Sequence, residues 1–351
     1  MKIAQVCSRY YPTIGGAETH VREISERLAE KGFNIEVITT DPSWKLPNSE
    51  VINKVKVIRF KSIAPNDGFF FSPQIWFYLR KNKYDIVHVH NYHGFPALFA
   101  AYALKDQSFI FTPHYHGAAI RQLLNKLYRT IGKKIFERAE KIVCVSQFEL
   151  NLIKRSFYIP EQKLICIPNG INYKDFKEIK KVKKDNKTIL FVGHIEKYKG
   201  VQYIINVLPM LDRVSIEVIG KGPYEKKLKR LAKDLGVSDR ITWVSQVPRK
   251  ELLVHYKSAD VFVILSQLEA YGIVVAEALT SGTPCVVAET SALIEFVDNK
   301  MCFGVKMPPS TNDLVKVILR AMSIKHSNYQ GKNILDWEEV VNLLIERVYK
   351  K

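Results

Sequence analysis

Residues 266–284 read SQLEAYGIVVAEALTSGTP and carry the clearest fold signal in the chain. An apolar, strand-like run at residues 261–265 precedes this stretch, which passes through a polar turn and Gly272 into a helical segment that ends at Ser281 and Gly282. A buried strand, a glycine-containing turn and a helix in this order are typical of an α/β domain with a parallel sheet. Loops that follow such strands carry the ligand-binding residues of these domains.

Two carboxylates, Glu269 and Glu277, stand eight residues apart in this stretch. We expect Glu269 in the loop and Glu277 two turns inside the helix, so that both reach one cleft. The loop amides would point outward at the helix N-terminus, where unpaired N–H groups and a positive partial charge suit phosphate. This pattern indicates a nucleotide-sugar site. The alternative is that both glutamates are ordinary solvent-exposed surface residues. A glutamate in an apolar run, however, needs hydrogen-bonding partners or a position in a cleft, because burying it unpaired costs several kcal/mol.

The length of 351 residues predicts two domains. A hydrophobic content of 47% with 25% charged residues is that of a soluble globular protein. No apolar run approaches the roughly 18 residues that a membrane-spanning helix needs. Residues 1–12 have too short an apolar stretch for a signal peptide and predict a first buried strand, so we expect a cytoplasmic protein.

The cysteine spacing and the net charge indicate which metal sites and which binding partners to expect. The five cysteines are scattered without a C-x-x-C pair, which predicts reduced core residues rather than a zinc site. The net charge of +18 favours anionic partners. Nucleotide diphosphate, lipid phosphate, an anionic membrane and nucleic acid all qualify, and charge alone does not choose among them.

Strand-like runs alternate with helical segments from end to end, which indicates parallel sheets covered on both faces. The expected strands are residues 3–7, 35–39, 55–60, 86–90, 109–112, 141–145 and 164–167, then 188–192, 214–219, 241–244, 261–265 and 285–288. We expect two Rossmann-like, doubly wound domains that face each other across a cleft. Their predicted bounds are residues 1–172 and 188–335, with a lysine-rich linker at 173–187 and a terminal helix at 336–351.

Gly15 and Gly16 follow the first strand and precede a helix expected from about Thr19 to Lys31. Two glycines let the backbone approach a ligand and offer amides to a phosphate, although a tight strand-to-helix turn would use them equally well. The pair is not a G-x-G-x-x-G fingerprint, which argues against a dinucleotide oxidoreductase.

Histidines cluster after two strands, as DIVHVHNYHG and FTPHYHG. Such residues can contact sugar hydroxyls or act as acids and bases. We expect His90, His93 and His114 on the acceptor side, and we single out His114 as functional because it follows a proline at the strand exit. His88 and His116 are predicted to be structural. No carboxylate stands at a suitable spacing, so no metal site is predicted.

The stretch FVGHIEKYKG, residues 191–200, ends a strand at Gly193 and places Lys197 and Lys199 in the next loop. A lysine held there could neutralise a departing diphosphate. We choose Lys199 because a glycine follows it. The alternative is a solvated lysine, which is common in so basic a chain.

Two segments suit an anionic membrane surface: a basic amphipathic stretch at residues 121–141 and the aromatic-rich residues 68–83. Core packing with a solvated basic face explains both equally well.

Taken in order, these motifs resemble glycosyltransferase family 4, a group of retaining transferases with the GT-B fold. The resemblance covers nearly the whole chain. It rests on GGAE, VHVH, TPHYHG, VSQFE, IPNGIN, FVGHIEKYKG, GKGP, the two glutamates with their trailing GTP, and DWEEV near the end. It implies a nucleoside-diphosphate-sugar donor on the second domain, an acceptor on the first, and a closing helix that packs back on the first domain.

The resemblance also implies residue roles. His114, Lys199 and Glu269 would be catalytic, with His114 near the donor sugar, Lys199 on the diphosphate and Glu269 on sugar hydroxyls. Glu277 would hold the ribose hydroxyls. The implied donor-binding set is Gly15, Gly16, Gly193, His194, Lys199, Ala270, Tyr271, Gly272, Ile273 and Glu277. Such enzymes need no catalytic metal, which fits the absence of a D-x-D stretch.

This chain departs from the family pattern at two positions. His194 stands where arginine is usual, so one fixed positive charge on the diphosphate is lost or depends on pH, unless Lys197 or Arg9 replaces it. Ala270 replaces the more frequent glycine, a mild change because the amide remains.

We therefore expect sugar transfer to an acceptor hydroxyl with retained anomeric configuration, by front-face displacement in which the departing diphosphate takes the acceptor proton. The acceptor would be a lipid-linked glycan, a polysaccharide or a small molecule, and the enzyme could sit peripherally on the cytoplasmic face of a membrane. Nucleic acid is not an expected partner. The alternatives are a non-catalytic basic binding protein derived from such a transferase, and a nucleotide-sugar epimerase.

Overall fold

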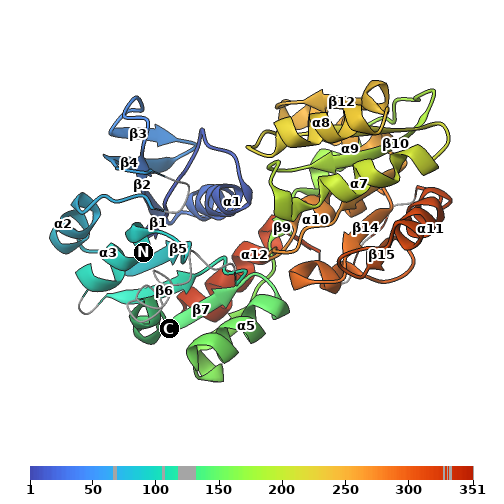
Figure 1. The fold of residues 1–351 in the computed structure, drawn as a ribbon. Coiled ribbons are helices and arrows are strands. Elements are labelled where there is room, and N and C mark those ends of the chain that lie inside the picture. Colours follow the sequence, from blue (N-terminus) through green and yellow to red (C-terminus); the bar gives the residue numbers. More distant parts are fainter. Residues whose placement is uncertain are drawn as a thin grey trace. The chain divides into compact units, whose positions relative to one another are not determined.

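The computed structural model describes residues 1–350 except 66–68, 105–106, 118–131, 327–328, 330 and 332–333. The chain forms two compact units. The first comprises Met1–Gly170 together with Leu335–Lys351, and the second comprises Ile171–Ile334 (Figure 1). The first unit is therefore built from both ends of the chain.

An eight-stranded sheet forms the centre of the first unit, in the order β3-β4-β2-β1-β5-β6-β7-β8. All neighbours are parallel except the edge strand β3, which runs antiparallel to β4. The strands are β1 (Lys2–Val6), β2 (Asn34–Asp41), β3 (Ser49–Ile52), β4 (Val55–Lys61), β5 (Ile86–His90), β6 (Ser108–Thr112), β7 (Lys141–Cys144) and β8 (Leu164–Cys166). The inner strands are buried along nearly their whole length, which explains their continuous apolar sequences.

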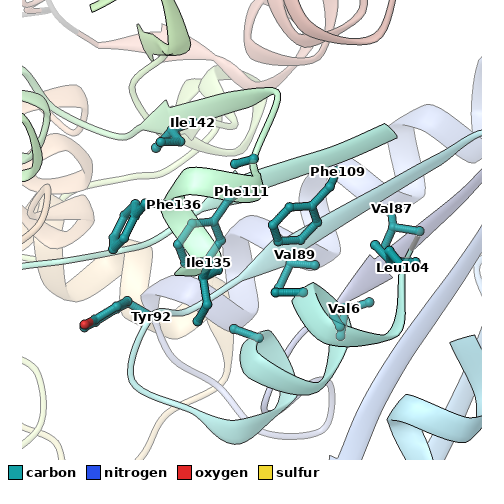
Figure 2. Packing of buried hydrophobic residues seen from close by; sticks show 14 of the residues in the cluster. Val6, Val87, Val89, Tyr92, Leu104, Phe109, Phe111, Ile135, Phe136 and Ile142 are labelled. Carbon is teal, nitrogen blue, oxygen red and sulfur yellow. The ribbon is translucent and has the colours of Figure 1, made fainter. Parts of the chain in front are cut away.

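Helices cover this sheet and enclose an aromatic core. They include α1 (Gly16–Glu30), α2 (Gln74–Lys81), α3 (Phe95–Ala103) and α5 (Gln147–Phe157). Figure 2 shows part of the core, where Phe111 packs against Phe136 with ring centroids 5.2 Å apart. Most of the predicted basic amphipathic segment lies outside the described residues, and residues 132–138 at its end are helical.

The second unit holds a six-stranded, wholly parallel sheet in the order β12-β11-β10-β13-β14-β15. Its strands are β10 (Lys187–Val192), β11 (Val214–Ile219), β12 (Ile241–Val244), β13 (Val261–Ile264), β14 (Cys285–Ala288) and β15 (Cys302–Val305). Its helices include α6 (Tyr173–Lys177), α7 (Val201–Val207), α8 (Glu225–Asp234), α9 (Arg249–Ser258), α10 (Ile273–Thr280) and α11 (Thr311–Met322). The two expected Rossmann-like sheets are confirmed.

The C-terminal segment belongs to the first unit. Strand β16 (Leu335–Asp336) pairs with β9 (Gly170–Ile171), and α12 (Trp337–Leu344) continues into a π-helical turn at Ile345–Tyr349. Asp336 and Glu339 form a capping box at the start of α12. Glu338 forms ion pairs with α1, 3.0 Å from Lys31 and 3.4 Å from Arg27. The segment thus packs on the first helix of the chain.

The structure differs from the sequence prediction in several places. Helix α1 begins at Gly16, three residues before the expected start, because Gly15 already has the extended conformation of an N-cap. Strands β3 and β15 were not predicted, since β3 is a half-exposed edge strand and β15 is interrupted by a glycine. The expected linker contains α6, whose Phe176 is buried against Arg249. No described helix combines the length and apolarity needed to cross a membrane.

Candidate functional site

Lys199 is held at the start of the second unit by a turn that only glycine permits. The chain leaves β10 and makes a 3-10 turn at Lys197–Lys199, which ends at Gly200 with φ of 84°. A Cβ on Gly200 would lie 2.5 Å from the carbonyl oxygen of Leu265. Gly200 therefore lets the turn pack against the end of β13, next to the loop that carries Glu269.

Lys199 and Glu269 form an ion pair, with Nζ 2.5 Å from Oε1. Each side chain is only 15% exposed. Burial works against the charged form of Lys199, but the charge and hydrogen bond of Glu269 outweigh it and raise the pKa of the lysine. Lys197 in the same turn is exposed. The structure therefore distinguishes the two candidate lysines: Lys199 is held in the ion pair, and Lys197 is exposed.

The loop after Glu269 leads directly into helix α10. Gly272 is the N-cap, with φ of 105°, and a Cβ there would lie 2.7 Å from Leu293 Cδ2. Tyr271 is buried, with its ring 5.3 Å from that of Phe296, while Ala270 and Ile273 are partly exposed. The first N–H groups of the helix lack intrahelical partners and can serve an anion.

Glu277 lies one turn inside α10, not two as predicted, because the helix begins only at Ile273. It is 7% exposed, and both of its oxygens are bound. One accepts a hydrogen bond from Arg249, and the other accepts from Tyr256 at 2.9 Å. The glutamate in an apolar run therefore finds its partners within the protein. The sequence analysis missed Arg249 and Tyr256, since nothing in the sequence of α9 pairs them with a helix further along the chain.

Gly193 and His194 follow β10. Gly193 has φ of 151° and lies against Gly220, where a Cβ would come within 1.9 Å of the Gly193 carbonyl oxygen. The glycine of the IGKGP stretch is thus required for close packing of two strand ends. The imidazole of His194 is about half exposed, and its Nδ1 lies 3.9 Å from Glu196.

In the first unit, a pocket lies at the carboxyl ends of β1, β5 and β6, where ligands of α/β domains bind. Its empty volume, including its open mouth, is about 590 Å³. It is lined by Ser8, Arg9, Ala17, Glu18, Phe70, Asn91, Tyr92, His93, Pro113, His114 and His116. It thus gathers two of the three predicted acceptor-side histidines, and also His116, which was predicted to be structural.

Charged groups at this pocket come from the segment around the two N-terminal glycines. Arg9 donates a hydrogen bond to Glu18 at 2.9 Å. Gly15 lies close to the same carboxylate: a Cβ there would lie 2.3 Å from Glu18 Oε2, so a larger residue would displace the Glu18 side chain. Gly16 is the exposed first residue of α1.

His114 lies in a loop that Glu149 holds in place. It has a left-handed backbone, with φ of 50°. Next to it, the backbone N–H of Tyr115 donates to one oxygen of Glu149, and that of Val145 donates to the other at 2.7 Å. Burial raises the pKa of Glu149 to about 8, opposed by these two hydrogen bonds. The VSQFE motif thus positions the TPHYHG loop.

His114 is one of three imidazoles that meet behind the pocket, with His20 of α1 and His90 at the end of β5. The ring centroids of His20 lie 5.0 Å from His114 and 5.4 Å from His90. Burial lowers the pKa of all three, that of His20 to about 4. Burial also lowers the pKa of His93 to about 4. His20 was not predicted as a site residue, because in the sequence it looks like one more residue of an amphipathic helix.

His88 is structural, as predicted. It is fully buried, and its two ring nitrogens lie 2.7 Å from Thr112 Oγ1 and 2.6 Å from the Tyr349 hydroxyl. The amide of Gln5 donates to the same hydroxyl at 3.3 Å, while the Gln5 carbonyl oxygen lies 2.8 Å from His90 Nε2. A continuous hydrogen-bonded chain therefore runs from Thr112 to His90 through the terminal tyrosine.

All five cysteines are free, and only Cys166 is not fully buried, in agreement with the predicted reduced core residues.

Two family models match the chain in succession. The model described as Glycosyltransferase Family 4 matches residues 14–175, and the model described as Glycosyl transferases group 1 matches residues 172–335. Together they span both α/β units.

Similar proteins include an uncharacterized glycosyltransferase, MJ1607, of Methanocaldococcus jannaschii, 29% identical over 100% of this chain and 94% of that protein. An alpha-monoglucosyldiacylglycerol synthase of Streptococcus pneumoniae is 25% identical over 92% of this chain and 78% of its own. Among solved structures, Alr3699/HepE from Anabaena in complex with UDP-glucose is 16% identical, with a TM-score of 0.78 over 99% of both chains. This likeness identifies the fold as GT-B.

Proposed function

Because this chain is a glycosyltransferase of the family 4 type, whose two family models match its two units in turn, we propose that it is a retaining enzyme that uses a nucleoside-diphosphate-sugar. The observation that carries the proposal is the ion pair of Lys199 and Glu269 directly before the N-terminus of α10. A cation, a carboxylate and free helix-end amides are the groups needed for a diphosphate and sugar hydroxyls. UDP-glucose occupies the structurally similar Anabaena protein.

Lys199 would bind the diphosphate and stabilise the negative charge that develops as it leaves. Its raised pKa keeps the lysine charged at neutral pH, as this role requires. Glu269 would then exchange part of its ion pair for sugar hydroxyls, while Glu277 would contact the ribose with the acceptor sites that Arg249 and Tyr256 leave free. We propose that the backbone of Gly193 and the side chain of His194 line the diphosphate.

The acceptor is proposed to bind the pocket of the first unit, with His93 on the acceptor side and His114 nearest the donor sugar. His90, which was predicted on the acceptor side, is 0% exposed and does not line this pocket, so it is not placed against the acceptor. His114 and His93 are neutral at pH 7, so they can exchange hydrogen bonds with hydroxyls without carrying charge. A lipid-linked or glycan acceptor is favoured by the similarity to a synthase of a glucosylated diacylglycerol. The acceptor hydroxyl would lose its proton to the departing diphosphate, and the step as proposed uses no catalytic metal.

The first test is a thermal-shift screen against UDP, GDP and ADP and their sugars. A ligand at about 100 times its dissociation constant adds roughly 2.7 kcal/mol of stability to the native state. The sugar donor identified in this way is then incubated with candidate acceptors, and the anomeric configuration of the product is read by NMR. An inverted product would refute the retaining mechanism, and a changed free sugar nucleotide without transfer would favour the epimerase alternative.

Lys199→Ala and the matched control Lys197→Ala then test the site. Loss of one charge-assisted contact to the leaving group is expected to lower turnover at least about 100-fold in Lys199→Ala. Lys197 lies in the same turn but is exposed, so its variant should retain turnover within a few-fold. Equal turnover in the two variants would overturn the assignment of Lys199. Salt-dependent oligonucleotide binding without transfer would instead favour the non-catalytic alternative.

A further inference from the structure

Three histidines of the first unit each have one ring nitrogen that lacks a hydrogen-bond partner among the described residues. These nitrogens are Nε2 of His20, Nδ1 of His90 and Nε2 of His114. One nitrogen of each ring can be chosen so that all three atoms lie within 4.8 Å of one another. His20 and His90 are no more than 1% exposed, so water outside the protein does not satisfy them. Buried polar atoms of this kind need a partner.

The opposite side of two rings fixes which nitrogen carries the proton. His20 Nδ1 lies 2.7 Å from the Asn169 side-chain oxygen, which can only accept, so Nδ1 is protonated and Nε2 presents a lone pair. His90 Nε2 lies 2.8 Å from the Gln5 side-chain oxygen, so Nε2 is protonated and Nδ1 presents a lone pair. His20 and His90, whose rings both lie within about 6 Å of the His114 ring, therefore each have a free lone pair on the nitrogen without a partner.

Both polar ends of the Gln5 side chain have a partner. The Gln5 amide nitrogen donates to the Tyr349 hydroxyl, which leaves the Gln5 oxygen for His90. The Tyr349 hydroxyl is also hydrogen-bonded to His88, which uses both of its nitrogens in hydrogen bonds and is not available as a ligand. The orientation of His90 thus depends on a network that reaches the end of the chain.

We propose that His20, His90 and His114 form a binding site for one divalent first-row transition-metal ion of the Zn²⁺ type. Neutral imidazole is the preferred nitrogen ligand of such ions, and three histidines with an open fourth position are an established zinc geometry. Amide oxygens behind the ligands, here those of Asn169 and Gln5, are the usual outer partners that orient them.

The geometry needs only a small adjustment. Zn–N distances of about 2.0–2.1 Å in a tetrahedral site place the nitrogens about 3.3 Å apart, so the most separated pair would approach by about 1.5 Å. His114 lines the pocket and gives the ion a route of entry and an open fourth position. Glu18 lines the same pocket, where it is paired with Arg9. An ion held there would occupy His114 and so compete with its proposed role in sugar transfer, a consequence that rests on the proposed function.

The test uses the full-length chain, dialysed against a chelator and then against metal-free buffer, without donor or acceptor. Co²⁺ is titrated and followed by its visible absorption, Zn²⁺ is measured by competition with a chromogenic chelator, and the bound metal is counted by elemental analysis. We expect one ion per chain. His20→Gln and His90→Gln should each weaken binding at least 100-fold, and His326→Gln in the second unit should leave it unchanged.

Asn169→Ala provides a second variant that keeps all three ligands and removes only the partner of His20. It is expected to weaken binding 10- to 100-fold, as outer partners of metal ligands generally do. Circular dichroism checks that each variant is folded. No binding at 100 µM Zn²⁺, or equal binding in the wild type and in Asn169→Ala, His20→Gln and His90→Gln, would overturn the proposal and leave a buried water as the partner of the three nitrogens. Because no sugar nucleotide is present, this result is independent of the proposed transferase activity.

Discussion

Replacing Lys199 by methionine should destabilise the second unit through the carboxylate that it leaves behind. In the native structure Lys199 and Glu269 are 2.5 Å apart and each is 15% exposed. Breaking a fully buried ion pair by removal of one partner costs about 3–5 kcal/mol, whereas an exposed pair contributes about 0–1 kcal/mol. The partial exposure places this pair between those limits, and we expect Lys199→Met to cost about 2 kcal/mol.

Thermal unfolding followed by circular dichroism measures this cost. For a unit of this size, 1 kcal/mol corresponds to a shift in Tm of roughly 2–4 °C, so the expected decrease is about 4–8 °C. The double variant Lys199→Met/Glu269→Gln removes both charges and should recover most of the loss. Lys197→Met is the matched control, because Lys197 is exposed, and its Tm should stay within about 1 °C of the wild type.

The pH dependence has a defined sign. The folded-state pKa of Lys199 is raised above the ordinary value of 10.5, so its contribution is fully present below pH 10.5 and is lost as the pH rises through the folded-state pKa. The difference between wild type and Lys199→Met should therefore be constant from pH 6 to 9. Equal Tm values for Lys199→Met and Lys197→Met, or a double variant less stable than Lys199→Met, would refute the reasoning.

Three further predictions concern the first unit. Tyr349→Phe removes the hydroxyl that His88 and Gln5 share and should cost about 1–3 kcal/mol in urea unfolding, whereas Tyr158→Phe, at a residue 85% exposed, should cost nothing measurable. Burial lowers the pKa of His20 from 6.5 to about 4, so as the pH drops the unfolded state binds the proton before the folded state does. The free energy of unfolding should therefore fall by about 3 kcal/mol for this residue between pH 6.5 and pH 4. Unfolding of His20→Gln should show a correspondingly weaker acid dependence, and identical pH profiles for the two proteins would contradict the assignment. Phe77, on α2, is 65% exposed, and two basic residues lie in the last turn of the same helix. If this helix contacts a membrane, Phe77→Ser should reduce cosedimentation with anionic vesicles several-fold, while Tyr158→Ser should not. An equal reduction in the two variants would speak against a specific contact.

Local sequence pattern was sufficient for most of the architecture. Continuous apolar runs such as residues 86–90 are buried parallel strands, and glycine turns such as Gly200 mark loops that must pass close to another strand. The edge strand β3 escaped prediction because its residues alternate between exposed and half-buried positions and no long apolar run marks it. Strand β15 escaped because its glycine lowers the strand signal.

The candidate sites were predictable only in part, because their members come from distant parts of the chain. Lys199 could be chosen from the glycine that follows it, since that glycine reports a close approach of the backbone. Arg249 and His20 carry no such local signal. Each lies in an ordinary helix and acquires its partner, Glu277 or His114, only when the sheet brings separate loops together. A single sequence does not contain that pairing.

The dependence of the N-terminal sheet on Tyr349 has a consequence for synthesis on the ribosome. The hydroxyl that bonds to His88 in β5 belongs to a residue that is translated only after the entire second unit. Domains generally fold in the order in which they leave the ribosome, but here the nascent first unit must wait with one nitrogen of a buried imidazole, His88 Nδ1, without its partner. The second unit can therefore reach its final form before the first unit, which is completed only when the segment that carries Tyr349 becomes available.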